Sequence, residues 1–200
     1  MTLPPLFSCH FPSYMKNCFN NEVDILWYQP EFTQSRYPPG QKLSEACTLI
    51  CLLVAVRISR GNVSIYDIEN CPRLNIIVAE AIIEGNTIHA WLIKKRLISH
   101  PYLNTEDALK HGGKSLNILK EWVTLFDSHS HTTDNSNHGL VIAQTTIDRL
   151  ESLCNWYIQD VLKNCYNIHA NKYELAFLYS YTQCKGHNRI LCECKKSCKM

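Results

Sequence analysis

The stretch that decides the fold is Gly40–Val56, which reads GQKLSEACTLICLLVAV. From Thr48 to Val56 it is apolar almost without interruption, and this predicts a helix buried on all sides in the middle of a domain. Ser44 is a suitable N-cap, and Arg60-Gly61-Asn62 is a typical stop signal. We therefore expect one buried helix over residues 44–59, with the rest of the chain packed around it.

A cysteine stands near the start of this helix. Cys47 lies where free backbone N–H groups and the helix dipole favour a thiolate. Gln41, six residues earlier, is placed to bring a side-chain donor beside the sulfur, as an oxyanion hole requires. The alternative for Cys47 is a small buried core residue, which is what we expect of Cys51 one turn later.

Composition limits the classes of protein to consider. The chain has 200 residues, enough for one domain with a substantial core, and 46% hydrophobic and 19% charged residues are typical of globular proteins. Its formal net charge of +2 gives no general electrostatic reason to expect nucleic acid or membrane binding. No apolar run approaches eighteen residues, so we expect no transmembrane helix.

The cysteines and the first residues indicate a cytoplasmic or nuclear protein. The eleven cysteines are an odd number, and four of them, Cys47, Cys51, Cys154 and Cys165, lie in apparently helical, apolar segments, which favours reduced thiols. The start of the chain lacks the basic and apolar regions of a signal peptide. Residues 1–24 are expected to form an extended arm, and residues 183–200 a basic, cysteine-rich tail.

Between arm and tail, the pattern of elements predicts an α+β domain over residues 25–182. Helices are expected in the N-terminal half, and strands together with one amphipathic helix in the C-terminal part. The expected helices cover residues 72–84, a short segment from about 105, and 147–163; the expected strands cover 116–119, 122–126, 138–143 and 173–181. Gly85-Asn86 is a predicted point of interruption in the helix that begins at Pro72.

An acid and a histidine follow the strand predicted for residues 122–126. Asp127 and His129 are two apart, so on an extended chain they project from the same face. The acid can then orient the imidazole of a general base. His131 shares this parity and His138 directly precedes the next strand, so both are competing candidates. We favour His129 because Asp127 gives it an orienting partner locally.

These residues together predict a cysteine hydrolase. Cys47 is the nucleophile, His129 the general base and acid, and Asp127 the orienting residue, while Gln41 and the backbone N–H of Cys47 hold the oxyanion. A cysteine on an early helix and a base on a later sheet is the order found in papain-like folds. We expect a central buried helix packed on a mainly antiparallel sheet.

The stretch FDSHSHTTDNSNHGLVIAQTTIDRLESLCNWYIQDVLKNCYNIHANKYELAFLY, residues 126–179, resembles the C-terminal half of papain-like ubiquitin-specific cysteine proteases. The herpesvirus large-tegument-protein type is the most similar, and the resemblance covers roughly residues 25–181. The positions that match the family's motif residues are Gln41, Cys47, Asp127 and His129. The resemblance implies ubiquitin or a ubiquitin-like protein as partner, with cleavage of the bond after the modifier's C-terminal Gly-Gly.

Two departures from the family keep a second hypothesis open. Thr48 follows the nucleophile where papain relatives often carry an aromatic residue, and Lys120-Glu121 joins two short strands abruptly. The alternative is a catalytically inactive relative that acts as a protein-interaction module.

The tail suggests a third hypothesis. Four of its five metal-binding side chains are enough for a tetrahedral zinc site, and the chain would then be a small zinc-dependent regulatory or nucleic-acid-binding protein. These side chains are Cys184, His187, Cys192, Cys194 and Cys198. A basic tail with free thiols is the alternative, and we otherwise expect no cofactor.

Overall fold

The computed structural model describes most of the chain. It covers residues 12–60, 63, 65, 67–98, 100–103, 122–133, 136–167, 172–182 and 188–199, without the side chains of 59, 60, 122, 172–182 and 188–199. The expected helix from about 105 and the expected strand 116–119 lie outside these residues. Helices and antiparallel sheet are both present, so the fold class is α+β.

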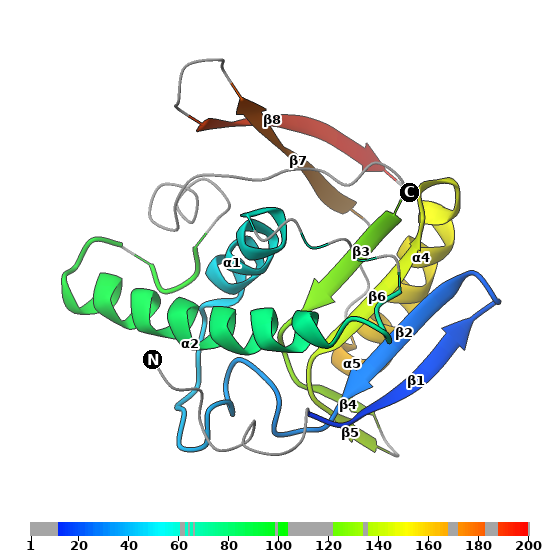
Figure 1. Ribbon diagram of the computed structural model, residues 1–200, viewed down its shortest axis with the longest axis horizontal. Coiled ribbons are helices and arrows are strands. Elements are labelled where there is room, and N and C mark those ends of the chain that lie inside the picture. The colour runs from blue at the N-terminus through cyan, green and yellow to red at the C-terminus, as the bar shows by residue number, and fades with distance from the viewer. Residues whose placement is uncertain are drawn as a thin grey trace.

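The centre of the fold is a four-stranded antiparallel sheet (Figure 1). Its order is β1 (Tyr14–Phe19), β2 (Val23–Tyr28), β6 (Val141–Thr146) and β3 (Trp122–Asp127). β1 lies inside the segment 1–24 that was expected to be an arm, so the sheet begins earlier in the chain than the sequence suggested. The sheet can take up β1 because a tight turn after Phe19 folds it back onto β2, with the Glu22 amide donating to the Phe19 carbonyl over 2.9 Å.

Two helices cover one face of the sheet. α1 (Cys47–Arg60) and α2 (Pro72–Lys94) pack together, and their apolar side chains meet those of β2 and β6. This core cluster includes Leu26, Tyr28, Ile50, Leu53, Val54, Val78, Ile82, Leu140 and Ile142. α1 is therefore a buried central helix, as expected, although it begins at Cys47 rather than at Ser44. Ser44 instead accepts the Ala46 amide through its hydroxyl, over 3.1 Å.

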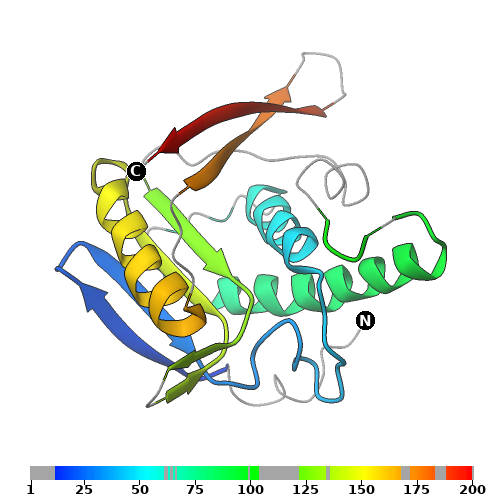
Figure 2. The same ribbon diagram turned by 180° about the vertical axis from the view of Figure 1, so that it is seen from behind.

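The other face of the sheet is covered by one continuous helical run, seen in front of the strands in Figure 2. It passes through a 3₁₀ turn (Ile147–Arg149), α4 (Leu150–Trp156), a π-helical stretch η3 (Tyr157–Lys163) and α5 (Asn164–Tyr166). Alternate side chains of β2 and β6 point to this face and pack against the buried side chains of the helical run. The strand residues are Val23, Ile25, Trp27, Val141 and Ala143, and the helical residues are Leu153, Trp156 and Val161. Ile147, the first residue of the amphipathic helix expected over 147–163, is 59% exposed and lies outside this apolar cluster.

α2 does not break at Gly85-Asn86, which corrects the sequence-based expectation. A Cβ on Gly85 would lie 2.5 Å from Cγ1 of Ile50 on α1, so the glycine allows the two helices to approach closely. The helix is long and apolar enough to cross a bilayer. Its buried face, however, carries polar side chains, including Asn75, Asn86 and His89, and packs in the protein core. Its length and composition are therefore explained by its place in the core.

The last two strands differ from the expectation in their pairing. β7 (Lys172–Thr182) was expected to join the central sheet, but it pairs with β8 (Asn188–Lys199) in a separate two-stranded antiparallel sheet. β8, the partner of β7, falls in the segment 183–200 that was expected to be a tail. A short hairpin, β4 (His131–Thr133) and β5 (Ser136–His138), follows β3.

Candidate active site

The candidate nucleophile and its candidate base come from the ends of two packed elements. Cys47 is the first residue of α1, and Asp127 is the last residue of β3. One helical turn after Cys47, the Cys51 thiol lies 3.9 Å from the Phe126 carbonyl oxygen, to which it donates. This contact joins the first turns of the helix to the end of the strand. The residues that follow β3 are thereby placed beside the helix N-terminus.

Asp127 and His129 form a close pair. The carboxylate Oδ1 accepts the His129 Nδ1–H over 2.6 Å and the His129 backbone N–H over 3.0 Å. Asp127 is buried, whereas the His129 side chain is 46% exposed. Because Nδ1 is the donor to the acid, the other ring nitrogen, Nε2, faces away from Asp127 and is free to meet a nucleophile.

The His129 ring reaches Cys47 on its other side. The nearby His129 ring lowers the pKa of the Cys47 thiol, against the effect of burial, which raises it. The hydrogen bond to Asp127, and then the interaction with Cys47, raise the pKa of His129 to about 10. Both shifts favour a thiolate–imidazolium pair, the reactive form of a catalytic cysteine.

The second oxygen of Asp127 has two further partners. Oδ2 accepts a hydrogen bond of 3.0 Å from the Tyr157 hydroxyl and lies 3.3 Å from Nε2 of His131. Burial alone would raise the pKa of the Asp127 carboxyl, but hydrogen bonds and charge from the two histidines lower it well below its usual range. The carboxylate is thus ionised and fixed on both oxygens.

The two competing histidines occupy different places. His131 is fully buried beneath Asp127, and its Nδ1 donates to the Gly139 carbonyl over 2.7 Å. His138 packs on Trp27, with ring centroids 5.1 Å apart, and its Nε2 lies 2.9 Å from the Ser136 hydroxyl. Of the three histidines, His129 is the one whose ring lowers the pKa of the Cys47 thiol.

Cys51 has the opposite character to Cys47. Desolvation by burial raises the pKa of its thiol to about 12, and the nearby Cys47 and Asp127 charges add to the shift. Its hydrogen bond goes to a backbone carbonyl rather than to a base. It is therefore a poorly reactive thiol, as the sequence suggested, although its residue is half-buried rather than part of the core.

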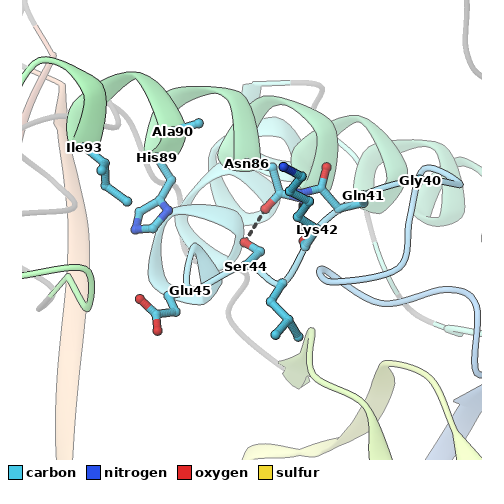
Figure 3. A pocket seen from close by; sticks show the side chains of 10 residues that line it. Gly40, Gln41, Lys42, Ser44, Glu45, Asn86, His89, Ala90 and Ile93 are labelled. Carbon is cyan, nitrogen blue, oxygen red and sulfur yellow. Dashed lines mark hydrogen bonds between the residues drawn. The ribbon is translucent and has the colours of Figure 1, made fainter.

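Gln41 lies in an open pocket of about 570 Å³ beside the site. Figure 3 shows the segment 40–45 on one side of this pocket and Asn86, His89 and Ile93 of α2 on the other. The Gln41 side-chain amide donates to the neighbouring Lys42 carbonyl over 3.1 Å. No contact between Gln41 and Cys47 is found among the described residues.

A different glutamine links the two halves of the site. Gln34 is 2% exposed, and its Nε2 donates to the Ser44 carbonyl, three residues before Cys47, over 2.8 Å. Its Oε1 accepts the hydroxyl of Ser128 over 2.7 Å, and Ser128 lies between Asp127 and His129. Asn86 of α2 completes the connection by donating to the Gln34 carbonyl over 2.8 Å.

Sequence reasoning missed Gln34 because it sits in an irregular, proline-containing segment without periodicity. The only signal for Gln34 in the sequence was its residue type, because a glutamine side chain can both donate and accept hydrogen bonds. Nothing in the local pattern, however, distinguished Gln34 from Gln41.

The candidate zinc ligands of the tail lie outside the described side chains. Cys184 and His187 lie outside the described residues, and the side chains of Cys192, Cys194 and Cys198 on β8 are likewise not described. Within the part of the chain that the structure describes, no group of three or more His, Cys, Asp or Glu side chains is arranged to hold a metal ion.

Comparison with known proteins adds no family to this description. No protein-family model, no curated protein and no solved structure matches the chain.

Proposed function

We propose that the protein is a thiol-dependent hydrolase in which Cys47, His129 and Asp127 act as nucleophile, general base and acid, and orienting residue. The observation that carries this proposal is the order of three neighbouring groups: the Cys47 thiol, the His129 ring that lowers its pKa, and the Asp127 carboxylate that is hydrogen-bonded to this ring. A buried acid, an imidazole and a cysteine at a helix N-terminus, in this order, supply what nucleophilic acyl transfer requires.

This arrangement supports a two-step reaction. The Cys47 thiolate attacks the carbonyl carbon of the scissile bond, while the thiol proton resides on His129. That proton then passes to the leaving amine, the C–N bond breaks, and an acyl-enzyme thioester remains. His129 next takes a proton from water, hydroxide adds to the thioester, and the proton returns to the departing sulfur. Asp127 stays ionised throughout and stabilises the imidazolium.

Gln34 is a better candidate than Gln41 for the side-chain donor to the oxyanion. A glutamine amide nitrogen carries two protons, and one of those on Gln34 is bonded to Ser44 just ahead of the nucleophile. The hydrogen bonds to Ser128 and Asn86 hold Gln34 in place, and such preorganisation is what an oxyanion donor needs. We assign the second donor to the backbone N–H of Cys47, which lies in the first turn of α1 and has no helical partner.

We further propose that the substrate is ubiquitin or a ubiquitin-like protein, cleaved after its C-terminal Gly-Gly, and that the fold is papain-like. The resemblance of residues 126–179 to ubiquitin-specific proteases is one support. The packing of α1 on an antiparallel sheet, with Asp127 at a strand end, is the second. A third is the apolar surface around the pocket, which suits a protein substrate: Leu43 is 94% exposed and Ile93 is 48% exposed.

A ubiquitin probe with a C-terminal electrophile tests this proposal. We expect the probe to label Cys47 alone among the eleven cysteines, with labelling lost in Cys47→Ala. Cys51→Ala is the matched control and should still be labelled. Labelling at Cys51 or in the tail would show that the assigned triad is wrong. A cooperatively folded protein that no such probe labels would favour the inactive interaction module.

A further inference from the structure

The pair Gly85-Asn86, at which the sequence predicted a break in α2, lies beside the first turn of α1. Gly85 allows this close approach, because a Cβ there would lie 2.5 Å from Cγ1 of Ile50. Ile50 belongs to the first turn of the helix that Cys47 begins. Asn86, the next residue of α2, is 8% exposed, so its side-chain amide needs partners inside the protein.

Both ends of the Asn86 side chain have such a partner. Nδ2 donates to the Gln34 carbonyl over 2.8 Å, and Oδ1 accepts a hydrogen bond from the Ser44 hydroxyl, which is drawn in Figure 3. A backbone carbonyl only accepts hydrogen bonds, so the amide cannot turn around without losing the first bond. The Ser44 hydroxyl in turn accepts the Ala46 backbone N–H over 3.1 Å. Asn86 thus holds the turn that leads into Cys47.

The segment that Asn86 holds through Gln34 is also tied to the loop after β3. The Gln34 backbone N–H donates to the Ser128 carbonyl over 2.9 Å, and Gln34 Oε1 accepts the Ser128 hydroxyl over 2.7 Å. Ser128 is buried and directly precedes His129. Asn86 is therefore connected, through one residue, to the loop that carries the candidate base.

We propose that Asn86 is a positioning residue that holds the turn before Cys47 and the loop before His129 at a fixed separation. Gly85 makes this possible by letting α1 approach α2. The two hydrogen bonds of the Asn86 side chain go to neither the nucleophile nor the base, so it acts through the segments that carry them. The catalytic meaning of this role rests on the proposed hydrolase, whereas the bonds are those of the resting protein. A displacement of about 1 Å at a reacting group can cost about 100-fold in rate.

Asn75 provides a matched control on the same helix. It is 7% exposed, and its Oδ1 accepts the Tyr28 hydroxyl rather than a group near the site. Asn75→Ala and Asn86→Ala each remove one buried amide from α2 and leave a buried polar partner unpaired, so both should lower Tm. Only Asn86→Ala should change the chemistry of Cys47.

The rate of Cys47 modification by iodoacetamide, measured against pH on the full chain, tests the positioning role. The thiolate displaces iodide at a carbon atom without forming an oxyanion, so the rate reports the thiolate and not the oxyanion donors. We expect the rate at pH 6 to fall about 10-fold in Asn86→Ala, with the pH profile moved upward, and to stay unchanged in Asn75→Ala. An unchanged profile in Asn86→Ala, or equal changes in both variants, would overturn the proposal.

If Asn86→Ala does not fold, Ser44→Ala decides the point. This variant removes the hydroxyl that Asn86 Oδ1 accepts and leaves α2 intact. We expect its alkylation profile to move in the same direction as that of Asn86→Ala. A Ser44→Ala protein that is folded and modified at the wild-type rate at pH 6 would refute the positioning role.

Turnover of ubiquitin carrying a fluorogenic C-terminal amide gives a second readout. We expect kcat to fall about 10–100-fold in Asn86→Ala with KM unchanged, and neither to change in Asn75→Ala. Asn86 also lines the pocket beside the site. A raised KM with unchanged kcat would therefore assign it to substrate binding and overturn the positioning role.

The positioning role and the hydrolase can fail separately. A lowered alkylation rate in Asn86→Ala, in a protein that no ubiquitin probe labels, would refute the ubiquitin hydrolase and leave the positioning role standing. An unchanged alkylation profile in a protein that turns over ubiquitin substrates would refute the positioning role alone.

Discussion

His129 donates to Oδ1 of Asp127 twice, through Nδ1 over 2.6 Å and through its backbone N–H over 3.0 Å. The acid therefore fixes both the ring and the main chain of the histidine two residues later. This acid–histidine unit is local, since it forms within a turn at the end of β3. Only Cys47 has to be brought to it through tertiary structure, on α1, 80 residues earlier in the chain.

Alkylation at low pH should distinguish Cys47 from Cys51. The pKa of the Cys47 thiol is lowered by His129, and that of Cys51 is raised to about 12 by burial. We expect iodoacetamide at pH 6 to modify Cys47 and to leave Cys51 unmodified, as mapped by peptide mass spectrometry. In His129→Ala the modification of Cys47 at pH 6 should be lost and should recover only at alkaline pH. Equal modification of the two thiols in the wild type would contradict the assigned pair.

Removal of the base or of its orienting acid should lower turnover to different extents. His129→Ala should slow ubiquitin-probe labelling by about 10²–10⁴-fold, because general acid–base catalysis is lost. Asp127→Asn should slow labelling less, because the His129 ring remains. The ring is then no longer oriented by the acid, and it loses the largest contribution to its raised pKa. Stopped-flow or gel-based labelling rates check the order. Slower labelling of Asp127→Asn than of His129→Ala would show that the acid does more than orient the His129 ring.

The stability of the protein should fall at alkaline pH through His129. Its folded pKa is raised to about 10 by Asp127 and Cys47, above an unfolded value of about 6.5. Protonated His129 therefore contributes stability that is fully present below about pH 6.5 and is lost as the pH rises through 10. We expect the Tm difference between wild type and His129→Gln to shrink from pH 6 to pH 10.5 in thermal melts. A difference that stays constant over this range would contradict the shift.

The two glutamines should behave differently. Gln34→Ala should lower kcat by about 10²–10³-fold if one oxyanion donor is lost, and it should also lower Tm, because Ser128 and the Ser44 carbonyl lose a buried partner. Gln41→Ala is the matched control, and its bond to Lys42 predicts little change in either quantity. The reverse pattern would restore Gln41 to the role that the sequence suggested.

Gly139 should not tolerate a side chain. A Cβ there would lie 2.1 Å from the Gln29 carbonyl oxygen and 2.7 Å from that of Phe32, so the backbone would have to move. We expect Gly139→Ala to cost about 1–3 kcal/mol or more in unfolding free energy, measured by urea denaturation. Gly40 has a φ of +87° but nothing within 4 Å, so Gly40→Ala should cost only about 1 kcal/mol. A smaller loss at Gly139 than at Gly40 would contradict this packing.

Local sequence patterns predicted several elements and residues correctly. The apolar run after Cys47 required a buried helix, and the runs at 122–126 and 173–181 indicated strands that the structure contains. The strand expected over 138–143 is present as β6, but it begins at Val141 and ends at Thr146. These elements follow from periodicity and side-chain type, which are properties of neighbouring residues. The spacing of Asp127 and His129 likewise placed both on one face.

The partners of those elements were decided only by tertiary structure. Sequence gave no reason for β7 to leave the central sheet for β8, because strand pairing depends on which surfaces remain after the core has packed. Gly85 continues α2 because Ile50 packs against it, and local helix propensity does not contain that contact. The hydrogen bonds that join Gln34 to Ser44 and to Ser128 likewise connect residues that are distant in sequence. Such contacts form only when the whole chain has folded.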